Sequence, residues 1–253
     1  MEHGYTQALC EAPVDASYSL QPSPIHFPSS NRMHIKLYGR PLSTATRRAA
    51  LVLVEKGVPF ELVSVDTLKK EQKAPAYLER HPFGQIPLLD DNGFLLYESR
   101  AIGRYIAEKY ANQGAPLLPG TLKGRALFEQ AASIELTNFD LYASQAYWAT
   151  DGIKRHGKEP NMILFHEMID KLGPKLDGYE TILSKQRYIS GDDVSLIDLF
   201  HLPFGSFLKS QSPGLFQSRP HLARWFDEVS ARPSWQLVKD GTQPTFLLLS
   251  DTQ

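Results

Sequence analysis

The first half of the chain alternates between two hydrophobic patterns. Four short runs are either alternating or wholly apolar, which is typical of strands, and two longer stretches place apolar residues at helical spacing. Asp91-Asn92-Gly93 is a hairpin signal between the last two runs, and Gly57 is a natural end for the first helix. The predicted strands are residues 34–38, 60–65, 86–89 and 94–97, and the predicted helices are residues 43–56 and 98–110. A crossover helix implies a parallel first pair, so the order is β-α-β, a loop, then β-β-α.

Beyond residue 120 the pattern indicates helices alone. Pro and Gly in residues 112–120 break both periods, which is typical of a linker. Ser195 and Asp198 have the spacing of a helix capping box, in which the carboxylate returns a hydrogen bond to the serine backbone. Pro233 ends the last predicted helix. The predicted helices are residues 122–150, 162–183 and 221–231.

These patterns divide the chain into two domains with a further segment at each end. Residues 1–32 hold four prolines among Ser, Gln and Tyr and follow neither period, so we expect a flexible or surface-draped extension without the basic start and apolar core of a secretory signal. An α/β domain is expected at residues 33–111 and an all-helical domain at residues 121–241, and the tail covers residues 242–253.

Composition excludes several classes of function. The 253 residues are 42% hydrophobic and 22% charged, as in globular proteins, and the net charge of −1 gives no basic footprint for nucleic acid or an anionic membrane. No apolar run reaches the roughly 18 residues that a membrane span needs. A single cysteine, Cys10, cannot form an intramolecular disulfide or a structural zinc cage. We therefore expect a cytoplasmic protein without a metal, a nucleic-acid partner or a membrane partner.

Ser43 lies where the first strand ends and the first helix begins. A helix N-terminus presents free N–H groups and a positive potential, which favour an anion. A serine hydroxyl at this point can donate to a thiolate and so lower the pKa of the thiol. The simpler interpretation is that Ser43 or Thr44 only caps the helix.

Two further clusters carry candidate chemistry. Pro87 stands at the start of a strand directly after a loop, where a cis bond would turn the backbone of Ile86 outward toward an extended peptide; an ordinary edge-strand proline is the alternative. Ser99 opens the next helix and could hold a carboxylate, while Glu98 beside it could take an ammonium group, as an amino-acid head group requires. A plain helix cap is the alternative for this pair.

Together these clusters resemble the glutathione transferase superfamily, and most closely its serine-type phi class of plants and fungi. Residues 80–87 (RHPFGQIP) are similar to the family's Asn-Pro-Phe-Gly-Gln-Val-Pro, residues 98–102 match the phi-class Glu-Ser-Arg-Ala-Ile, and residues 190–199 are similar to the capping motif of the family's helical domain. The resemblance covers about residues 33–241. It implies a thioredoxin-like N-terminal domain followed by an all-helical C-terminal domain.

The resemblance also implies roles for individual residues. Ser43 would stabilise the thiolate of glutathione. The glutathione-binding residues would be Gln72 and Lys73 at the glycyl carboxylate, Gln85 at the peptide, Ile86 pairing by its backbone beside a cis Pro87, and Glu98 and Ser99 at the γ-glutamyl end. The chain departs from the phi pattern at Gln72, where His is usual, and at Arg80, where Asn is usual. We expect the first departure to alter affinity, because glutamine can still donate a hydrogen bond.

A pocket for the hydrophobic substrate is expected between the domains. The residues expected to line it are Leu42, Thr44, Thr67, Tyr147 and Trp148. Core packing is the equal alternative for Trp148, and it is the favoured interpretation for Phe139, Trp225 and Trp235. Tyr38 competes with Ser43, because other transferase classes use a tyrosine near the end of the first strand, but packing beneath the site is favoured.

The resemblance implies an enzyme that conjugates glutathione to hydrophobic electrophiles, with peroxidase activity as a compatible side reaction. It needs no cofactor, since glutathione is a co-substrate. A homodimer is expected, with Phe83 as the candidate for insertion into the partner or for burial within its own chain. The alternatives are a non-catalytic carrier of hydrophobic ligands and, with less support, an accessory domain of a translation factor. A serine in place of the cysteine of redox relatives argues against thiol–disulfide exchange.

Overall fold

The α/β domain is built on one mixed sheet. The computed structural model describes residues 35–243 together with 245 and 246, so the predicted extension at 1–32 and Cys10 lie outside the described residues. The strands follow the spatial order β4-β3-β1-β2-β5. Their bounds are β1 Ile35–Gly39, β2 Phe60–Ser64, β3 Leu88–Asp91, β4 Phe94–Tyr97 and β5 Thr245–Phe246. Strand β1 runs parallel to β2 and antiparallel to β3, which is the arrangement expected of a thioredoxin-like domain.

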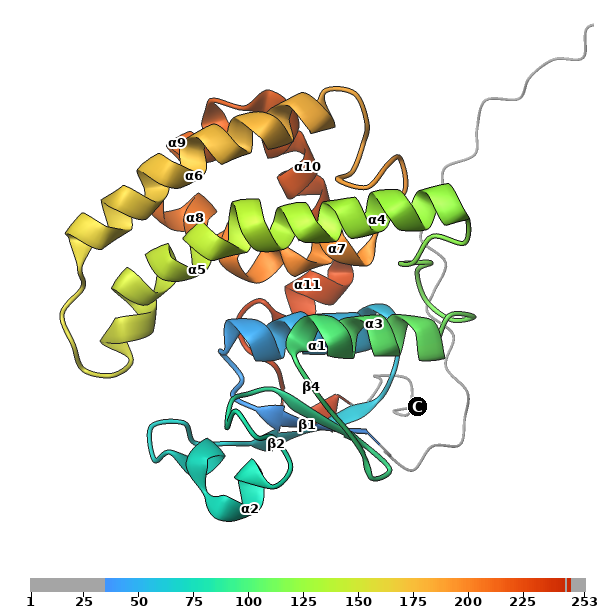
Figure 1. Cartoon of the computed structure of the whole chain (residues 1–253), viewed down its shortest axis with the longest axis vertical. Helices are drawn as coiled ribbons and strands as arrows, with labels where there is room; N and C mark the ends of the chain where they lie inside the picture. Colours follow the sequence, from blue (N-terminus) through green and yellow to red (C-terminus); the bar gives the residue numbers. More distant parts are fainter. Residues whose placement is uncertain (1–34, 244, 247–253) are drawn as a thin grey trace, which may run out of the picture.

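Helices α1 and α3 lie between the sheet and the helical domain (Figure 1). The helical elements of the α/β domain are α1 Thr44–Glu55, the 3₁₀ turn η1 Glu71–Lys73, α2 Pro75–Leu78 and α3 Ser99–Lys109. Helix α1 packs against α3 and against α7, α8 and α11 of the helical domain. Because α1 is covered on both sides, nine of its twelve residues are buried, including the charged Arg48 and Glu55.

The third strand begins two residues later than the pattern predicts. The peptide bond between Ile86 and Pro87 is cis, as expected, and Pro87 has no N–H to give to a strand ladder. The ladder therefore starts at Leu88 and continues to Asp91. The predicted hairpin is confirmed: Asn92 and Gly93 have φ of 54° and 92°, the positive values that a tight two-residue turn requires.

The helical domain contains more elements than the pattern predicts. The predicted helix 122–150 is present as four consecutive helical segments. The π-helical segment η2 follows α4, and the π-helical segment η3 follows α5. The short elements α7, α8, α9 and α11 and the strand β5 were not predicted as such. The bounds are α4 Leu122–Ile134, η2 Glu135–Asp140, α5 Leu141–Tyr147, η3 Trp148–Gly152, α6 Met162–Leu183, α7 Leu196–Phe200, α8 Leu202–Gln211, α9 Gly214–Gln217, α10 Pro220–Ser230 and α11 Pro233–Val238. Pro233 follows the end of α10, as predicted, but it also occupies the first turn of α11, where proline is favourable.

The predicted capping box is present at the start of α7. The Asp198 carboxylate accepts hydrogen bonds of 2.8 Å from both the backbone N–H and the hydroxyl of Ser195. It also accepts from the backbone N–H of Ile189 at 3.0 Å and from the indole of Trp225 at 2.8 Å. Asp198 is fully buried, so these four bonds fix the centre of the helical domain.

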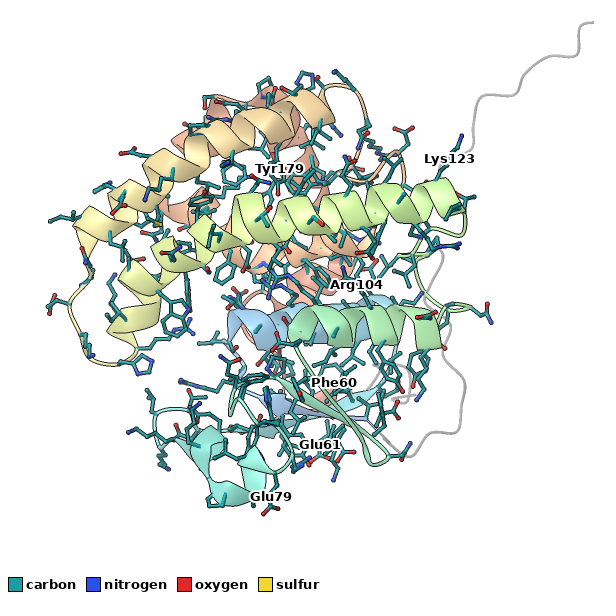
Figure 2. All side chains as sticks on the ribbon, in the orientation of Figure 1. Phe60, Glu61, Glu79, Arg104, Lys123 and Tyr179 are labelled. Atoms are coloured by element: carbon teal, nitrogen blue, oxygen red, sulfur yellow. The ribbon has the colours of Figure 1, made fainter. Side chains whose placement is uncertain are left out.

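A single hydrophobic cluster connects the two domains. It extends from Phe60 in the sheet to Tyr179 in α6, both of which are labelled in Figure 2. Trp225, Trp235 and Phe139 belong to this core, as predicted. None of the described helices is long and apolar enough to cross a membrane.

Candidate active site between the domains

A cleft of about 560 Å³ lies where the α/β domain meets the helical domain. Most residues singled out in the sequence line it together, although they come from distant parts of the chain. These are Ser43, Thr44, Thr67, Gln72, Lys73, Gln85, Ile86, Pro87, Glu98, Ser99, Tyr147 and Trp148. Leu42 is the exception. Its side chain is half exposed and is not part of the lining, because it extends from the loop toward Gly241.

Ser43 both caps α1 and faces the cleft. Its Oγ accepts a hydrogen bond of 3.3 Å from the backbone N–H of Thr46, so the capping interpretation is confirmed. A capping hydroxyl acts as an acceptor, which leaves its own O–H available to donate to a ligand. The first turn of α1 holds no acidic residue that would oppose an anion. Tyr38 does not line the cleft, and its ring packs under the guanidinium of Arg80 at 4.1 Å.

Gln72 and Lys73 reach the cleft from the 3₁₀ turn η1. The Lys73 ammonium donates to the carbonyl of Phe83 at 2.8 Å, and the buried side-chain oxygen Oε1 of Gln72 has no hydrogen-bond partner in the described part of the chain. Gly84 has φ of 55°, and an added Cβ there would lie 2.6 Å from the Gln72 carbonyl oxygen. Glycine at position 84 therefore allows η1 to approach the loop that precedes Ile86.

Ile86 offers an unpaired backbone edge to the cleft. Within the described residues no hydrogen bond ends on its N–H or its C=O, and the ladder of β3 begins only at Leu88. The preceding carbonyl, that of Gln85, accepts a 2.8 Å bond from the Tyr77 hydroxyl. A free N–H and C=O on one residue can pair with an extended peptide as a neighbouring strand would.

Glu98 and Ser99 lie at the start of α3, where a buried arginine holds Ser99. Glu98 has φ of 68°, an uncommon conformation for a residue other than glycine and one often associated with functional sites. The Ser99 hydroxyl accepts a 3.1 Å hydrogen bond from Arg48, whose guanidinium also binds Asp140 at 3.2 Å and the Phe200 carbonyl at 3.3 Å. Burial lowers the pKa of Arg48 to about 10, which leaves it charged at neutral pH.

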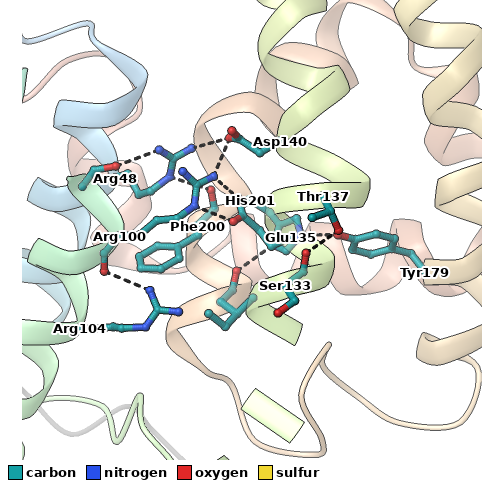
Figure 3. A network of polar contacts seen from close by, with 12 residues as sticks. Arg48, Arg100, Arg104, Ser133, Glu135, Thr137, Asp140, Tyr179, Phe200 and His201 are labelled. Carbon is teal, nitrogen blue, oxygen red and sulfur yellow. Dashed lines mark hydrogen bonds and ion pairs between the residues drawn. The ribbon is translucent and has the colours of Figure 1, made fainter. Parts of the chain in front are cut away.

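Arg100 completes an ion-pair network that joins the two domains (Figure 3). Its guanidinium makes two bonds of 2.7 Å to the Glu135 carboxylate and approaches Asp140 at 2.7 Å. Burial opposes ionisation of Glu135, but the bonds and charge of Arg100 outweigh it and hold the pKa of that carboxyl below its usual value. Both acids come from η2, and neither was among the residues predicted to line the site. In the sequence, Glu135 and Asp140 stand out only as acidic residues within the predicted helix 122–150.

The helical domain contributes an aromatic wall. Tyr147 is buried and packs with its ring centroid 5.5 Å from that of Phe204 and 5.3 Å from that of Phe207. Trp148 is 53% exposed, so it belongs to the wall of the cleft and not to the core. Arg155 also lines the cleft from this side, with its guanidinium 5.5 Å from the centroid of the Tyr147 ring. Among the described residues no cluster of His, Cys, Asp and Glu could hold a metal ion.

Both domains of the chain match families of known proteins. A model of the N-terminal domain of glutathione S-transferases matches residues 33–108, and a model of their C-terminal domain matches residues 150–233. Glutathione S-transferase PM239X14 of Arabidopsis thaliana is 45% identical over 196 residues, which cover 76% of this chain and 89% of that protein. The chain belongs to the glutathione S-transferase family. It is a glutathione transferase whose named relatives include phi-class plant enzymes.

Solved structures of other plant glutathione transferases have the same fold as this transferase. Glutathione transferase F7 of Populus trichocarpa has a TM-score of 0.79 and 36% identity, and the match covers 83% of this chain and 99% of that one. Glutathione S-transferase I of maize, solved with an atrazine glutathione conjugate, has a TM-score of 0.75 and 31% identity, with 81% and 96% covered. The expected fold class, a thioredoxin-like domain followed by an all-helical domain, is thereby confirmed.

Proposed function

We propose that the transferase conjugates glutathione to hydrophobic electrophiles and that Ser43 activates the thiol. The Ser43 hydroxyl donates to the sulfur and holds it as a thiolate, which attacks an electrophile lying against Tyr147 and Trp148. The observation that carries this proposal is that the cap at α1 uses Ser43 as an acceptor, so its proton is free to point into the cleft. The N-terminus of α1 adds a favourable potential for the anion.

The rest of the cleft fits an extended tripeptide. In this proposal Lys73 and Gln72 bind the glycyl carboxylate, and the free N–H and C=O of Ile86 pair with the cysteinyl backbone beside Pro87 and Gln85. Glu98 binds the α-ammonium group and Ser99 the α-carboxylate at the γ-glutamyl end, with the charge of Arg48 directly behind the Ser99 hydroxyl. This arrangement matches each charge of the tripeptide with an opposite charge or a donor. No cofactor takes part, because glutathione is the co-substrate.

The same thiolate supports a peroxidase side reaction. Attack on an organic hydroperoxide breaks the O–O bond, releases the alcohol and leaves glutathione as a sulfenic acid. A second glutathione then condenses with it to the disulfide and releases water. The atrazine glutathione conjugate bound in the maize structure named above is the kind of product that the other route gives, in which the sulfur bonds to carbon.

Replacing the proposed activating serine tests the main assignment. We expect Ser43→Ala to keep its dissociation constant for glutathione within a few-fold and to lose about tenfold in turnover for each pKa unit by which the hydroxyl lowers the thiol pKa. Conjugation of an aryl halide and calorimetric titration with glutathione measure the two quantities. Tyr38→Phe is the matched control, since it also removes a hydroxyl near the end of β1, and it should stay active. A fully active Ser43→Ala with an inactive Tyr38→Phe would reverse the assignment.

We further propose that the transferase is a cytosolic homodimer and that Phe83 inserts into the partner. The location rests on the sequence, with its single cysteine, and the dimer on the exposed ring of Phe83, which is 64% accessible at the edge of the α/β domain. Light scattering should show Phe83→Ser as a monomer, while Ile163→Ser, which removes another exposed apolar side chain, should stay dimeric. A dimeric Phe83→Ser protein would exclude this contact.

A further inference from the structure

The cleft holds more positive charge than its own acids neutralise. Five of its lining residues are arginine or lysine, and two, Glu98 and Asp140, are acidic. Arg48 and Arg100 have carboxylate partners, since both bind Asp140 and Arg100 also binds Glu135. If glutathione binds as proposed above, Lys73 and Glu98 each pair with an oppositely charged group of the tripeptide. Two lining cations, Arg40 and Arg155, are then left over.

Neither leftover arginine has an acidic partner among the described residues. Arg40 donates to the hydroxyl of Thr67 at 2.9 Å, and Arg155 donates to the carbonyl of Leu42 at 3.1 Å. Both acceptors are neutral oxygens, and both arginines are only partly buried. Asp151, four residues before Arg155, forms an ion pair with Lys154 at 3.6 Å. The two guanidinium groups therefore keep an uncompensated charge in the cleft.

Both charges lie beside residues expected to line the electrophile pocket, because Arg155 lies over the Tyr147 ring and Arg40 is bonded to Thr67. The guanidinium of Arg155 donates a hydrogen bond to the carbonyl of Leu42, the residue before Ser43. Burial raises the pKa of the Tyr147 hydroxyl, and the charges of Arg155, Arg47 and Arg40 only partly oppose this rise. Arg47 lies behind the lining and donates to the carbonyl of Lys239 at 2.5 Å. The expected electrophile pocket thus combines an aromatic wall with positive charge.

We propose that the preferred electrophile is aromatic and carries a carboxylate, which Arg40 and Arg155 bind while the ring packs on Tyr147 and Trp148. This inference rests on the proposed function for the position of glutathione. Carboxylates suit a guanidinium because its planar donors can bind both oxygens, and a partly desolvated pair of this kind is stronger than one between neutral groups. The arginines would then select the substrate and leave activation of the thiol to Ser43.

A pair of electrophiles that differ only in charge tests the proposal. In 4-chloro-3,5-dinitrobenzoate and its methyl ester, the thiolate forms a C–S bond at the chlorinated carbon and chloride leaves with the electron pair of the C–Cl bond. After each rate is divided by that with free glutathione, we expect the wild type to favour the acid by about tenfold or more in kcat/KM, the size of one charge-assisted hydrogen bond. Arg40→Met and Arg155→Met should each remove most of this preference, and Arg155→Lys should keep part of it.

The matched control and a binding measurement make every outcome decisive. Lys158→Met removes the same charge near Arg155 but outside the lining, and it should keep the preference. A wild type without preference for the acid would overturn the proposal. Arginine variants that slow the reactions of acid and ester equally would also overturn it, because the arginines would then act on the thiolate or on the stability of the fold. Calorimetry with the two finished conjugates, S-(4-carboxy-2,6-dinitrophenyl)glutathione and its methyl ester, needs no turnover. Tighter binding of the acid without catalysis would refute the proposed function alone, whereas catalysis without acid preference would refute this inference alone.

Discussion

At the scale of single residues, the proposed γ-glutamyl site depends on Ser99 and the arginine behind it. The Arg48 bond orients the Ser99 hydroxyl toward the cleft, so we expect Ser99→Ala to weaken glutathione binding about tenfold, as the loss of a hydrogen bond to a charged group does. Turnover at saturating glutathione should change little, because the proposal places the sulfur at Ser43. Calorimetry and steady-state kinetics measure both quantities. Ser144→Ala, another serine of the lining, is the control, and an equal loss in both variants would contradict the assignment.

The cleft residues that the sequence pattern alone could place are those at the ends of predicted elements, whereas Gln72 and Lys73 were named only through the resemblance. Ser43 and Ser99 each open a helix, and Pro87 precedes a strand, so the ends of predicted elements already placed them. Leu42 was wrongly expected in the lining, since neighbouring residues of a loop need not point the same way. Arg155 could not be foreseen, because it meets the Leu42 carbonyl across 113 positions of the chain and nothing in its own neighbourhood signals that contact.

At the scale of elements, α3 and η2 are joined by the bidentate pair of Arg100 and Glu135. Glu135→Gln leaves the arginine with a buried, incompletely paired charge, and we expect it to lower the free energy of unfolding by about 3–5 kcal/mol. Urea titration followed by circular dichroism gives this value. Glu129→Gln on the preceding helix breaks only the surface pair with Arg104 and should cost less than about 1 kcal/mol. Similar losses in the two variants would show that burial of this pair is unimportant.

The pattern of apolar residues predicted where helices and strands occur, but it did not predict the local geometry within them. Strands β1, β2 and β4 and helices α1, α3 and α6 follow directly from their periods. A π-helical segment has no such signature: residues 135–140 continue the helical run of α4 into α5 and contain no proline or glycine that would mark a change of geometry. Strand β5 has two residues, and its pairing with β2 is set by a neighbour almost 190 positions away.

At the scale of the whole molecule, buried groups predict how stability depends on pH, and burial lowers the pKa of His81 as it does that of His201. Burial lowers the pKa of His201, whose ring nitrogens bind the Tyr179 hydroxyl at 3.0 Å and the Ile197 carbonyl at 2.8 Å. The unfolded chain therefore takes up a proton near pH 6.5 that the folded chain refuses, and stability falls as the pH drops below that value. Glu135 adds a second loss below about pH 4.3, since its folded pKa is also lowered.

Urea titrations between pH 7.5 and pH 4.5 measure this dependence. The free energy of unfolding should be nearly constant above pH 7 and should decline through pH 6 and 5. His201→Gln, which cannot take up the proton, should flatten the decline while lowering stability at all pH values. An unchanged slope in that variant would show that another group causes the decline.

The state of the bound sulfur tests the central claim most directly. Ultraviolet difference spectra of the complex with glutathione, recorded across a pH titration, report the thiolate band. The account predicts that wild type shows this band at neutral pH and that Ser43→Ala, at saturating glutathione, shows it only at higher pH. A band that is absent from the wild-type complex at neutral pH, or that titrates identically in the two proteins, would contradict it.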